Sequence, residues 1–268
     1  MTEAPIGVFD SGIGGLSVYL EMRRLLNGGR IIYVADQGFG MYGERSLDVV
    51  RRRSEQVSGR LIDAGASAVV VACNSASAAA LDHLRRRWPD TPFVGMEPAV
   101  KPAALLTAGD TTAGGTTAGG VTRGGTIGVM ATKATFQGEL FASVVDRFAG
   151  DHQVVATACP GLAEAVEDDA AGIDDLIDEY VGRTLARGAE VLVLGCTHYS
   201  LIRDRIIACA GDVPVIDPAP AVARQAQRIV EPRVGGPDSF LTTGDTGRFA
   251  IQIDRLGLDP ARVGSFAV

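Results

Sequence analysis

Two cysteine motifs, each placed directly after a run of apolar residues, constrain the fold of this chain more than any other feature. One motif spans Val69–Ser77 and the other Val191–Tyr199, and in both the cysteine is followed by side chains that donate hydrogen bonds. Short apolar runs of this kind predict buried strands. Functional sites in open parallel sheets form at the carboxyl ends of strands. The matched motifs therefore predict one site with the sulfur of Cys73 on one side and that of Cys196 on the other.

Strands and helices are expected to alternate along the first hundred residues. Apolar runs that end in turn residues predict strands at 6–10, 31–35, 68–72 and 92–96. Amphipathic stretches between them predict helices at 16–26, 47–64 and 76–88. This alternation is typical of an α/β fold with a parallel sheet and helices on both of its faces.

The same pattern restarts in the second half of the chain. Strands are expected at 126–130, 154–156 and 191–194, with helices at 133–148 and 173–187. Cys73 follows Ile6 by 67 residues, and Cys196 follows Ile127 by 69. We interpret this spacing as an internal duplication, although any two α/β units share some likeness. The prediction is two similar open parallel-sheet α/β domains related by pseudo-symmetry, with the active site in the cleft between them.

The predicted domains are not continuous in sequence. Residues 1–97 and 213–268 are assigned to the first domain, and residues 98–212 to the second. A strand at 213–216 and a helix at 219–229 are expected to return to the first unit, and 240–243 to add an edge strand. The segment 107–125 contains Thr-Thr-Ala-Gly-Gly twice and no apolar periodicity, so we expect a surface loop and assign it no function.

The charge of the chain limits its partners. A formal net charge of −7 argues against nucleic acid and anionic membranes as partners. An anionic small molecule would have to be held by backbone N–H groups and helix N-termini. No apolar run reaches the roughly 18 residues that cross a bilayer, and the first five residues lack the basic region of a signal peptide. A cytoplasmic protein is therefore expected.

Neither a metal nor an organic cofactor is expected. The four cysteines form no C-x-x-C pair, and the three histidines are far apart in sequence. Only two lysines are available for a Schiff base, Lys101 and Lys133, which disfavours a pyridoxal phosphate enzyme.

Four side chains that can carry chemistry end predicted strands, namely Asp10, Asp36, Cys73 and Cys196. A free thiol is only about 3% ionised at pH 7, and a following helix N-terminus is expected to raise that fraction. His198 follows Cys196 by two residues and is a candidate proton partner. The other two cysteines, Cys159 and Cys209, are expected to be small buried apolar side chains.

Two other readings of these motifs are weaker. The loop Asp10–Gly15 invites a nucleotide-binding interpretation, but Ser17 stands where the dinucleotide fingerprint requires its third glycine. Cys196 and Arg203 are one residue too far apart for the C-x5-R loop of a phosphatase.

Three segments resemble the signatures of glutamate racemases, within the aspartate/glutamate racemase superfamily. They are Ile6–Gly15, Ala72–Ser77 and Gly195–Tyr199. Lesser matches are Tyr42-Gly43, Gly128–Thr135, Ala158–Pro160 and Glu167. These matches span nearly the whole chain in the family's order.

The resemblance implies a cofactor-independent racemase that interconverts L- and D-glutamate and supplies D-glutamate for peptidoglycan. It implies that Cys73 takes the α-proton from the D-isomer and Cys196 from the L-isomer, with the other thiol returning a proton to the opposite face. It further implies that Asp10 assists Cys73, and that Glu167 and His198 assist Cys196. The residues implied to hold the substrate are Asp10, Ser11, Tyr42, Gly43, Asn74, Ser75, Thr135, Thr197 and His198. A homodimer is also implied, with its mode left open.

One loop departs from the family pattern. Family members commonly have Pro-Tyr-Gly where this chain has Met41-Tyr42-Gly43, and Gln37–Gly40 just before it is also atypical. Because this loop shapes the pocket for the side-chain carboxylate, an aspartate racemase or a broader acidic amino-acid racemase stays open as the alternative.

Overall fold

Two parallel sheets organise the molecule. The computed structural model describes residues 4–26, 28–108, 124–230 and 236–268. The first sheet has the order β10-β9-β2-β1-β3-β4, and every neighbouring pair in it is parallel. Its strands are β1 (Ile6–Asp10), β2 (Ile31–Ala35), β3 (Ala68–Val71), β4 (Phe93–Gly95), β9 (Ser239–Thr242) and β10 (Val263–Ser265).

The second sheet repeats the centre of the first. Its order is β6-β5-β7-β8, again with parallel pairing throughout. The strands are β5 (Thr126–Ala131), β6 (Gln153–Ala158), β7 (Val191–Gly195) and β8 (Val215–Ile216). In each unit the first strand pairs with the second and the third, which gives the same 2-1-3-4 order. The predicted fold class, two similar parallel-sheet α/β units, is confirmed.

Helices cover both faces of each sheet, which is why strands such as β1, β3 and β7 are buried along their whole length. The first sheet packs against α1 (Leu16–Leu25) and α11 (Ala219–Ile229) on one face and α2 (Leu47–Asp63) and α3 (Asn74–Arg87) on the other. Helix α12 (Thr246–Arg255) follows β9. The second sheet packs against α4 (Val100–Ala108) and α6 (Glu139–Phe148) on one face and α7 (Leu162–Asp168), α8 (Ile173–Leu185), α9 (Thr197–Leu201) and α10 (Arg203–Ala210) on the other.

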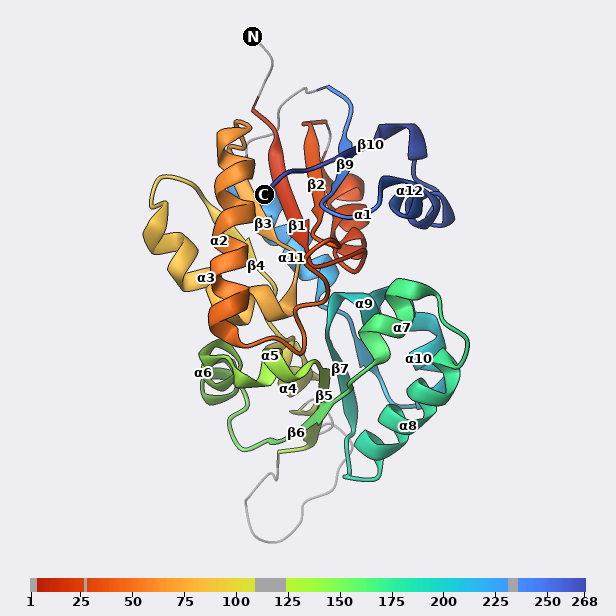
Figure 1. Cartoon of the computed structure of the whole chain (residues 1–268). Coiled ribbons are helices and arrows are strands. Elements are labelled where there is room, and N and C mark those ends of the chain that lie inside the picture. The colour runs from red at the N-terminus through yellow and green to blue at the C-terminus, as the bar shows by residue number, and fades with distance from the viewer. Residues whose placement is uncertain (1–3, 27, 109–123, 231–235) are drawn as a thin grey trace, which may run out of the picture.

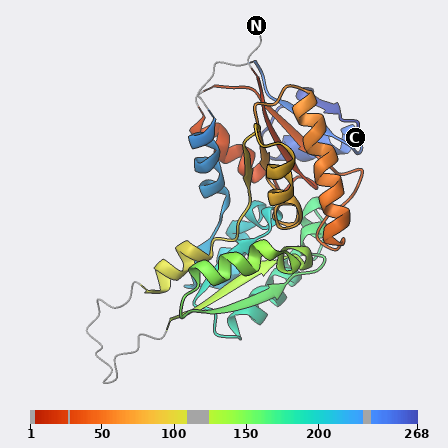
Figure 2. The same ribbon diagram turned by 90° about the vertical axis from the view of Figure 1, so that its left-hand side faces the viewer.

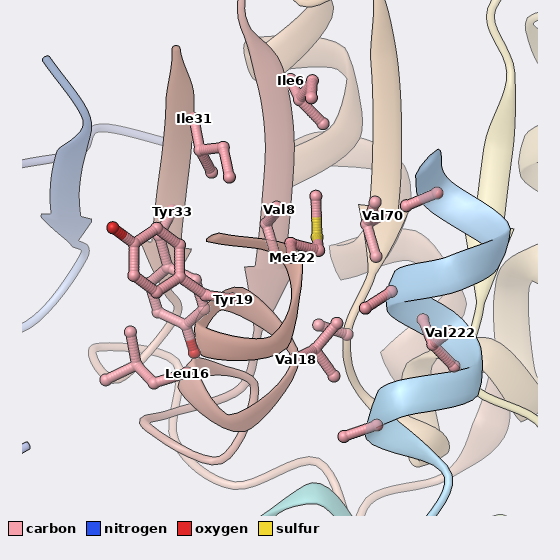
Figure 3. Close-up of a cluster of buried hydrophobic side chains, with 14 of the residues drawn as sticks. Ile6, Val8, Leu16, Val18, Tyr19, Met22, Ile31, Tyr33, Val70 and Val222 are labelled. Atoms are coloured by element: carbon pink, nitrogen blue, oxygen red, sulfur yellow. The ribbon is translucent and has the colours of Figure 1, made fainter. Parts of the chain in front are cut away.

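The two units lie one above the other (Figures 1 and 2). In the core of the first unit, side chains one turn apart on α1 pack against side chains of the sheet and of α11. Val18 and Met22 of α1 lie among Val8, Val70 and Val222, which come from two strands and α11 (Figure 3). Burying an aliphatic side chain of this size stabilises the fold by about 1.5–3 kcal/mol. This packing fixes the strand ends that carry the site.

Two expectations about the C-terminal region are wrong. Strand β8 pairs with β7 of the second sheet, so the chain returns to the first unit one element later than predicted, with α11. We therefore propose moving the second domain limit from 212 to 216 and keeping the one at 97. The segment expected as an edge strand, 240–243, lies inside the sheet because β10 pairs with β9.

The helix expected over 133–148 is interrupted. It consists of α5 (Lys133–Gln137) and α6, separated by the extended residue Gly138. A Cβ atom at Gly138 would lie 2.6 Å from Cβ of Ala78 and 2.8 Å from its carbonyl oxygen. The close approach of α3 therefore leaves no room for a side chain at the break between α5 and α6.

No helix among the described residues combines the length and apolarity that crossing a bilayer requires. Most of the expected loop at 107–125 lies outside the described residues.

Candidate active site

The polar side chains singled out from the sequence gather where β1, β3 and β7 end. Asp10 is the last residue of β1, while Cys73 and Cys196 follow β3 and β7 closely and cap α3 and α9. All three are buried, with the two cysteines 5% and 6% exposed. The matched strand order thus gives the two thiols matched positions, one in each unit.

Cys73 lies beside a carboxylate and a hydroxyl. Its Sγ atom is 3.9 Å from Oγ of Ser11, and Asp10 accepts backbone N–H bonds from Ser11 at 2.7 Å and Gly15 at 2.5 Å. Burial, followed by the charge of Asp10, raises the pKa of Cys73 well above its usual value, outweighing the N–H of Ala76. The expected gain in ionisation from the helix start is therefore wrong for Cys73, which is a neutral thiol in this arrangement.

Asp10 itself has an unusual environment. Burial raises the pKa of this carboxyl above its ordinary value, against the charge of His198 and the donors around it. A carboxyl group placed in this way can exchange a proton with the neighbouring thiol.

Cys196 has a different kind of partner. Its Sγ atom lies 3.9 Å from Nδ1 of His198, whose Nε2 lies 2.7 Å from Oε2 of Glu167. Burial lowers the pKa of His198, but the contacts with Cys196 and Glu167 outweigh burial and raise it well above 6.5. Burial likewise opposes ionisation of Glu167, yet hydrogen bonding to His198 holds its pKa below the ordinary value. The pair is therefore imidazolium and carboxylate near neutral pH.

The two halves of the site are in contact. Oγ1 of Thr197, beside Cys196, lies 3.3 Å from Oδ2 of Asp10 and donates to it across the units. After burial and Asp10, the charge of Cys196 is among the causes that raise the pKa of Cys73. The two thiols therefore share one electrostatic environment.

The glycine loop after β1 is explained by this contact between the units. A Cβ atom at Gly12 would lie 2.2 Å from Oε2 of Glu167, and one at Gly14 would lie 2.7 Å from the backbone nitrogen of His198. The backbone N–H of Ile13 donates to Oε2 of Glu167 at 2.8 Å. The loop thus holds a protein carboxylate, and the glycines require no nucleotide.

Buried polar groups next to Cys73 provide donors for a ligand. Oγ of Ser75 lies 2.9 Å from Oγ1 of Thr132, which lies 3.0 Å from Oγ1 of Thr135. Both side-chain polar atoms of Asn74, which is 3% exposed, lack a hydrogen-bond partner among the described residues. Since buried amides are normally paired, Asn74 is the side chain here most in need of an external partner.

Tyr42 and Gly43 occupy the loop between β2 and α2. The hydroxyl of Tyr42 donates to Asp36 at 2.5 Å, and Arg53 binds the same carboxylate at 2.7 and 2.8 Å. The hydroxyl of Tyr42 therefore already has a hydrogen-bond partner within the protein. The carbonyl of Gly43 accepts from the N–H of Ala134 in the second unit at 3.0 Å. This leaves backbone groups as the means by which this loop can contact a ligand.

Sequence reasoning missed three contributors, Gln37, Thr132 and Gln252. Thr132 was the easiest to find, because it caps α5 and lies within the matched segment Gly128–Thr135. Of the two remaining cysteines, Cys159 is buried, and burial raises its pKa to about 12. Cys209 is only partly buried, contrary to expectation. No cluster of three or more potential metal ligands occurs within the described ranges.

Comparisons with known proteins agree with the motifs. Residues 6–226 match the family described as Asp/Glu/Hydantoin racemase. The protein named glutamate racemase of Roseiflexus sp. (strain RS-1) is 45% identical over 97% of this chain and 94% of its own, and that of Pseudomonas entomophila is 42% identical over 98% and 97%. The crystal structure of Escherichia coli glutamate racemase, in complex with L-glutamate and the activator UDP-MurNAc-ala, superposes with a TM-score of 0.83 at 26% identity, covering 99% of both chains. The chain therefore belongs to the Asp/Glu/Hydantoin racemase family, with the glutamate racemases among its relatives, and the resemblance seen in its three motifs is confirmed.

Proposed function

We propose that this protein is a glutamate racemase that works without a cofactor by proton transfer between two thiols. The observation that carries the proposal is the pair of buried thiols at matched strand ends, each with its own proton partner. Cys73 has Asp10, and Cys196 has the pair of His198 and Glu167. Removing a proton from one face of a carbon and returning one to the other requires two such groups.

Each direction starts from one thiolate and one thiol. In the L-to-D direction the thiolate of Cys196 takes the α-proton, and the thiol of Cys73 then donates a proton to the opposite face. In the D-to-L direction the proton of Cys73 first passes to the carboxylate of Asp10. The thiolate of Cys73 then takes the α-proton, and the thiol of Cys196 donates a proton to the opposite face. The imidazolium of His198 lies beside the sulfur of Cys196, whereas burial and the charge of Asp10 favour the thiol form of Cys73 by raising its pKa. General acid–base partners of this kind typically contribute 10²- to 10⁴-fold.

The carbanion that forms at the α-carbon needs preorganised donors. We assign this role to the unpartnered amide of Asn74, the hydroxyls of Ser75, Thr135 and Thr197, and backbone N–H groups near Ser11 and Gly43. Such donors act most strongly where water is excluded. The burial of these side chains supports the assignment.

The test is circular dichroism of L-glutamate incubated with the protein and a thiol reductant, in the absence of pyridoxal phosphate. We expect the optical signal to decay to zero as the racemate forms. A signal that persists with folded protein would overturn the proposal.

The alternative substrate is aspartate, or several acidic amino acids. The observation that favours it is the loop before Tyr42, where Met41 stands in place of the common proline and packs against the core of the second unit. Turnover of aspartate and glutamate compared in the same assay decides between them, and we expect glutamate to be preferred.

The proposed role in the cell is supply of D-glutamate for peptidoglycan, by a cytoplasmic homodimer. The similarity to proteins named glutamate racemase over nearly the whole chain supports this role. Complementation of a D-glutamate auxotroph tests the role, and light scattering tests the dimer.

A further inference from the structure

The carboxylate of Glu167 is held from the opposite unit as well as by His198. Its Oε1 atom accepts from Nε2 of Gln37 at 2.6 Å, and its Oε2 atom accepts from the N–H of Ile13 at 2.8 Å. Glu167 belongs to α7 of the second unit, whereas Gln37 and Ile13 follow β2 and β1 of the first. The orientation of this carboxylate is therefore set where the two units meet.

Gln37 is itself fixed in one orientation. Its Oε1 atom accepts from Oγ1 of Thr242 at 2.9 Å, and its Nε2 atom also donates to Oε1 of Gln252 at 2.6 Å. Gln252, from α12, donates in turn to the backbone carbonyl of Glu167 at 2.7 Å. An amide nitrogen has two N–H groups, and here both have acceptors. The amide of Gln37 is thus held in one orientation, with one N–H group directed at Glu167.

From this geometry we propose that Gln37 is a positioning residue for the Cys196 half of the reaction. The inference rests on the proposed two-thiol function. Gln37 orients Glu167, Glu167 orients the imidazole of His198, and that imidazole faces Cys196. Among the described contacts, no hydrogen bond links Gln37 to Asp10 or Ser11, the partners of Cys73. Loss of this amide should therefore slow proton transfer at Cys196 and leave proton transfer at Cys73 unchanged.

Comparing kcat/KM for L- and D-glutamate cannot show that only one of the two proton transfers is slowed. The two enantiomers have equal free energy, so kcat/KM is the same in both directions for any variant. Isotope effects do separate the halves. Deuterium at the α-carbon of L-glutamate slows the transfer to Cys196, and deuterium at the α-carbon of D-glutamate slows the transfer to Cys73.

The experiment compares wild type with Gln37→Met, which keeps the side-chain length and removes the amide. We expect kcat/KM to fall about 10- to 100-fold, as for loss of a hydrogen bond to a charged group. We also expect the isotope effect on kcat/KM to rise with L-[2-²H]glutamate and to fall with D-[2-²H]glutamate. Gln227→Met is the control, because that amide donates to a carbonyl on the exposed surface of the first unit, and it should change neither isotope effect.

A second variant, Gln37→Glu, adds a pH readout. The protonated side chain can still donate to Glu167, whereas the ionised one repels it. We expect its activity relative to wild type to rise as the pH is lowered. Unchanged isotope effects in Gln37→Met, or a pH-independent activity ratio for Gln37→Glu, would overturn the role of Gln37. A wild-type protein that does not racemise glutamate would overturn the proposed function instead.

Discussion

The imidazole Nε2 of His198 lies 2.7 Å from Oε2 of Glu167, and both side chains are buried. This pair lies beside Cys196, whereas Cys73 has the carboxyl group of Asp10 beside it. Two similar units have therefore placed different proton partners at equivalent strand ends. A reaction between mirror-image substrates can use such unequal partners, because each thiol needs only to exchange one proton with one face.

The two thiols should be individually indispensable. We expect Cys73→Ser and Cys196→Ser each to lower racemisation by at least about 10³-fold, because a serine hydroxyl is a far weaker acid than a thiol. Circular dichroism of L-glutamate measures the loss. Cys209→Ser is the matched control, since this thiol lies in α10 and is only partly buried. Near wild-type turnover in either active-site variant would contradict the two-thiol account.

The glycine loop should tolerate no side chain at its contact with His198. In Gly14→Ala the new Cβ would lie 2.7 Å from the backbone nitrogen of His198, so the units must separate or the loop must shift. We expect kcat/KM to fall at least about 10-fold. Gly182→Ala is the control, because a Cβ atom at this position in α8 would meet nothing within 4 Å. Replacing a glycine inside a helix by alanine stabilises the fold by about 0.5–1 kcal/mol. Equal activity of the two variants would argue against this contact.

The pair of His198 and Glu167 should make stability depend on pH. The raised pKa of His198 contributes stability that is complete below about pH 6.5 and is lost as the pH rises through the higher folded value. The lowered pKa of Glu167 contributes stability that is present above about pH 4.5 and is lost as the pH falls through the lower folded value. Urea unfolding between pH 6.5 and 8.5 should show stability falling more steeply for wild type than for His198→Gln. Parallel slopes would mean that the imidazole is not protonated in the folded protein.

Asp10 should control the ionisation of Cys73. Burial and then Asp10 raise the pKa of this thiol, so Asp10→Asn should lower it while leaving it above the ordinary value. The measurement is the pH dependence of iodoacetamide labelling at Cys73, followed by peptide mass spectrometry. Cys159 is the internal control, because its raised pKa has burial as its main cause and Asp10 is not among the others. A variant in which Cys73 labels no faster at a given pH would contradict the assignment.

The fold was largely predictable because its signals are local. Buried parallel strands such as β1, β3 and β7 are short apolar runs that end in a polar or small residue, and the spacing between Ile6 and Cys73 recurs between Ile127 and Cys196. Strand β8 was misplaced because two residues carry no information about which sheet they join. Helix α7 has seven residues and was not predicted at all.

The site was predictable where chemistry and position coincide, as at Cys73, Cys196 and His198. Gln37 and Gln252 could not be identified as site residues, because a neutral amide has no characteristic pattern. Their importance depends on contacts with Glu167 that span 130 and 85 residues of sequence. From the sequence, the glycines after Asp10 stand only as an incomplete dinucleotide-binding loop and as part of the first family motif. Their cause lies in the close approach of Glu167 and His198 from the other unit.

The central claim is that two different thiols act on opposite faces of one carbon. The most direct measurement is early-phase racemisation of L-glutamate in D₂O, with deuterium at the α-carbon of both enantiomers followed by NMR and mass spectrometry. We predict that nearly every D-glutamate molecule formed carries deuterium, while the remaining L-glutamate keeps protium, because the departing and arriving protons belong to different sulfurs. Protium retained in the D-product, or deuterium appearing in the L-substrate as fast as the product forms, would contradict the account.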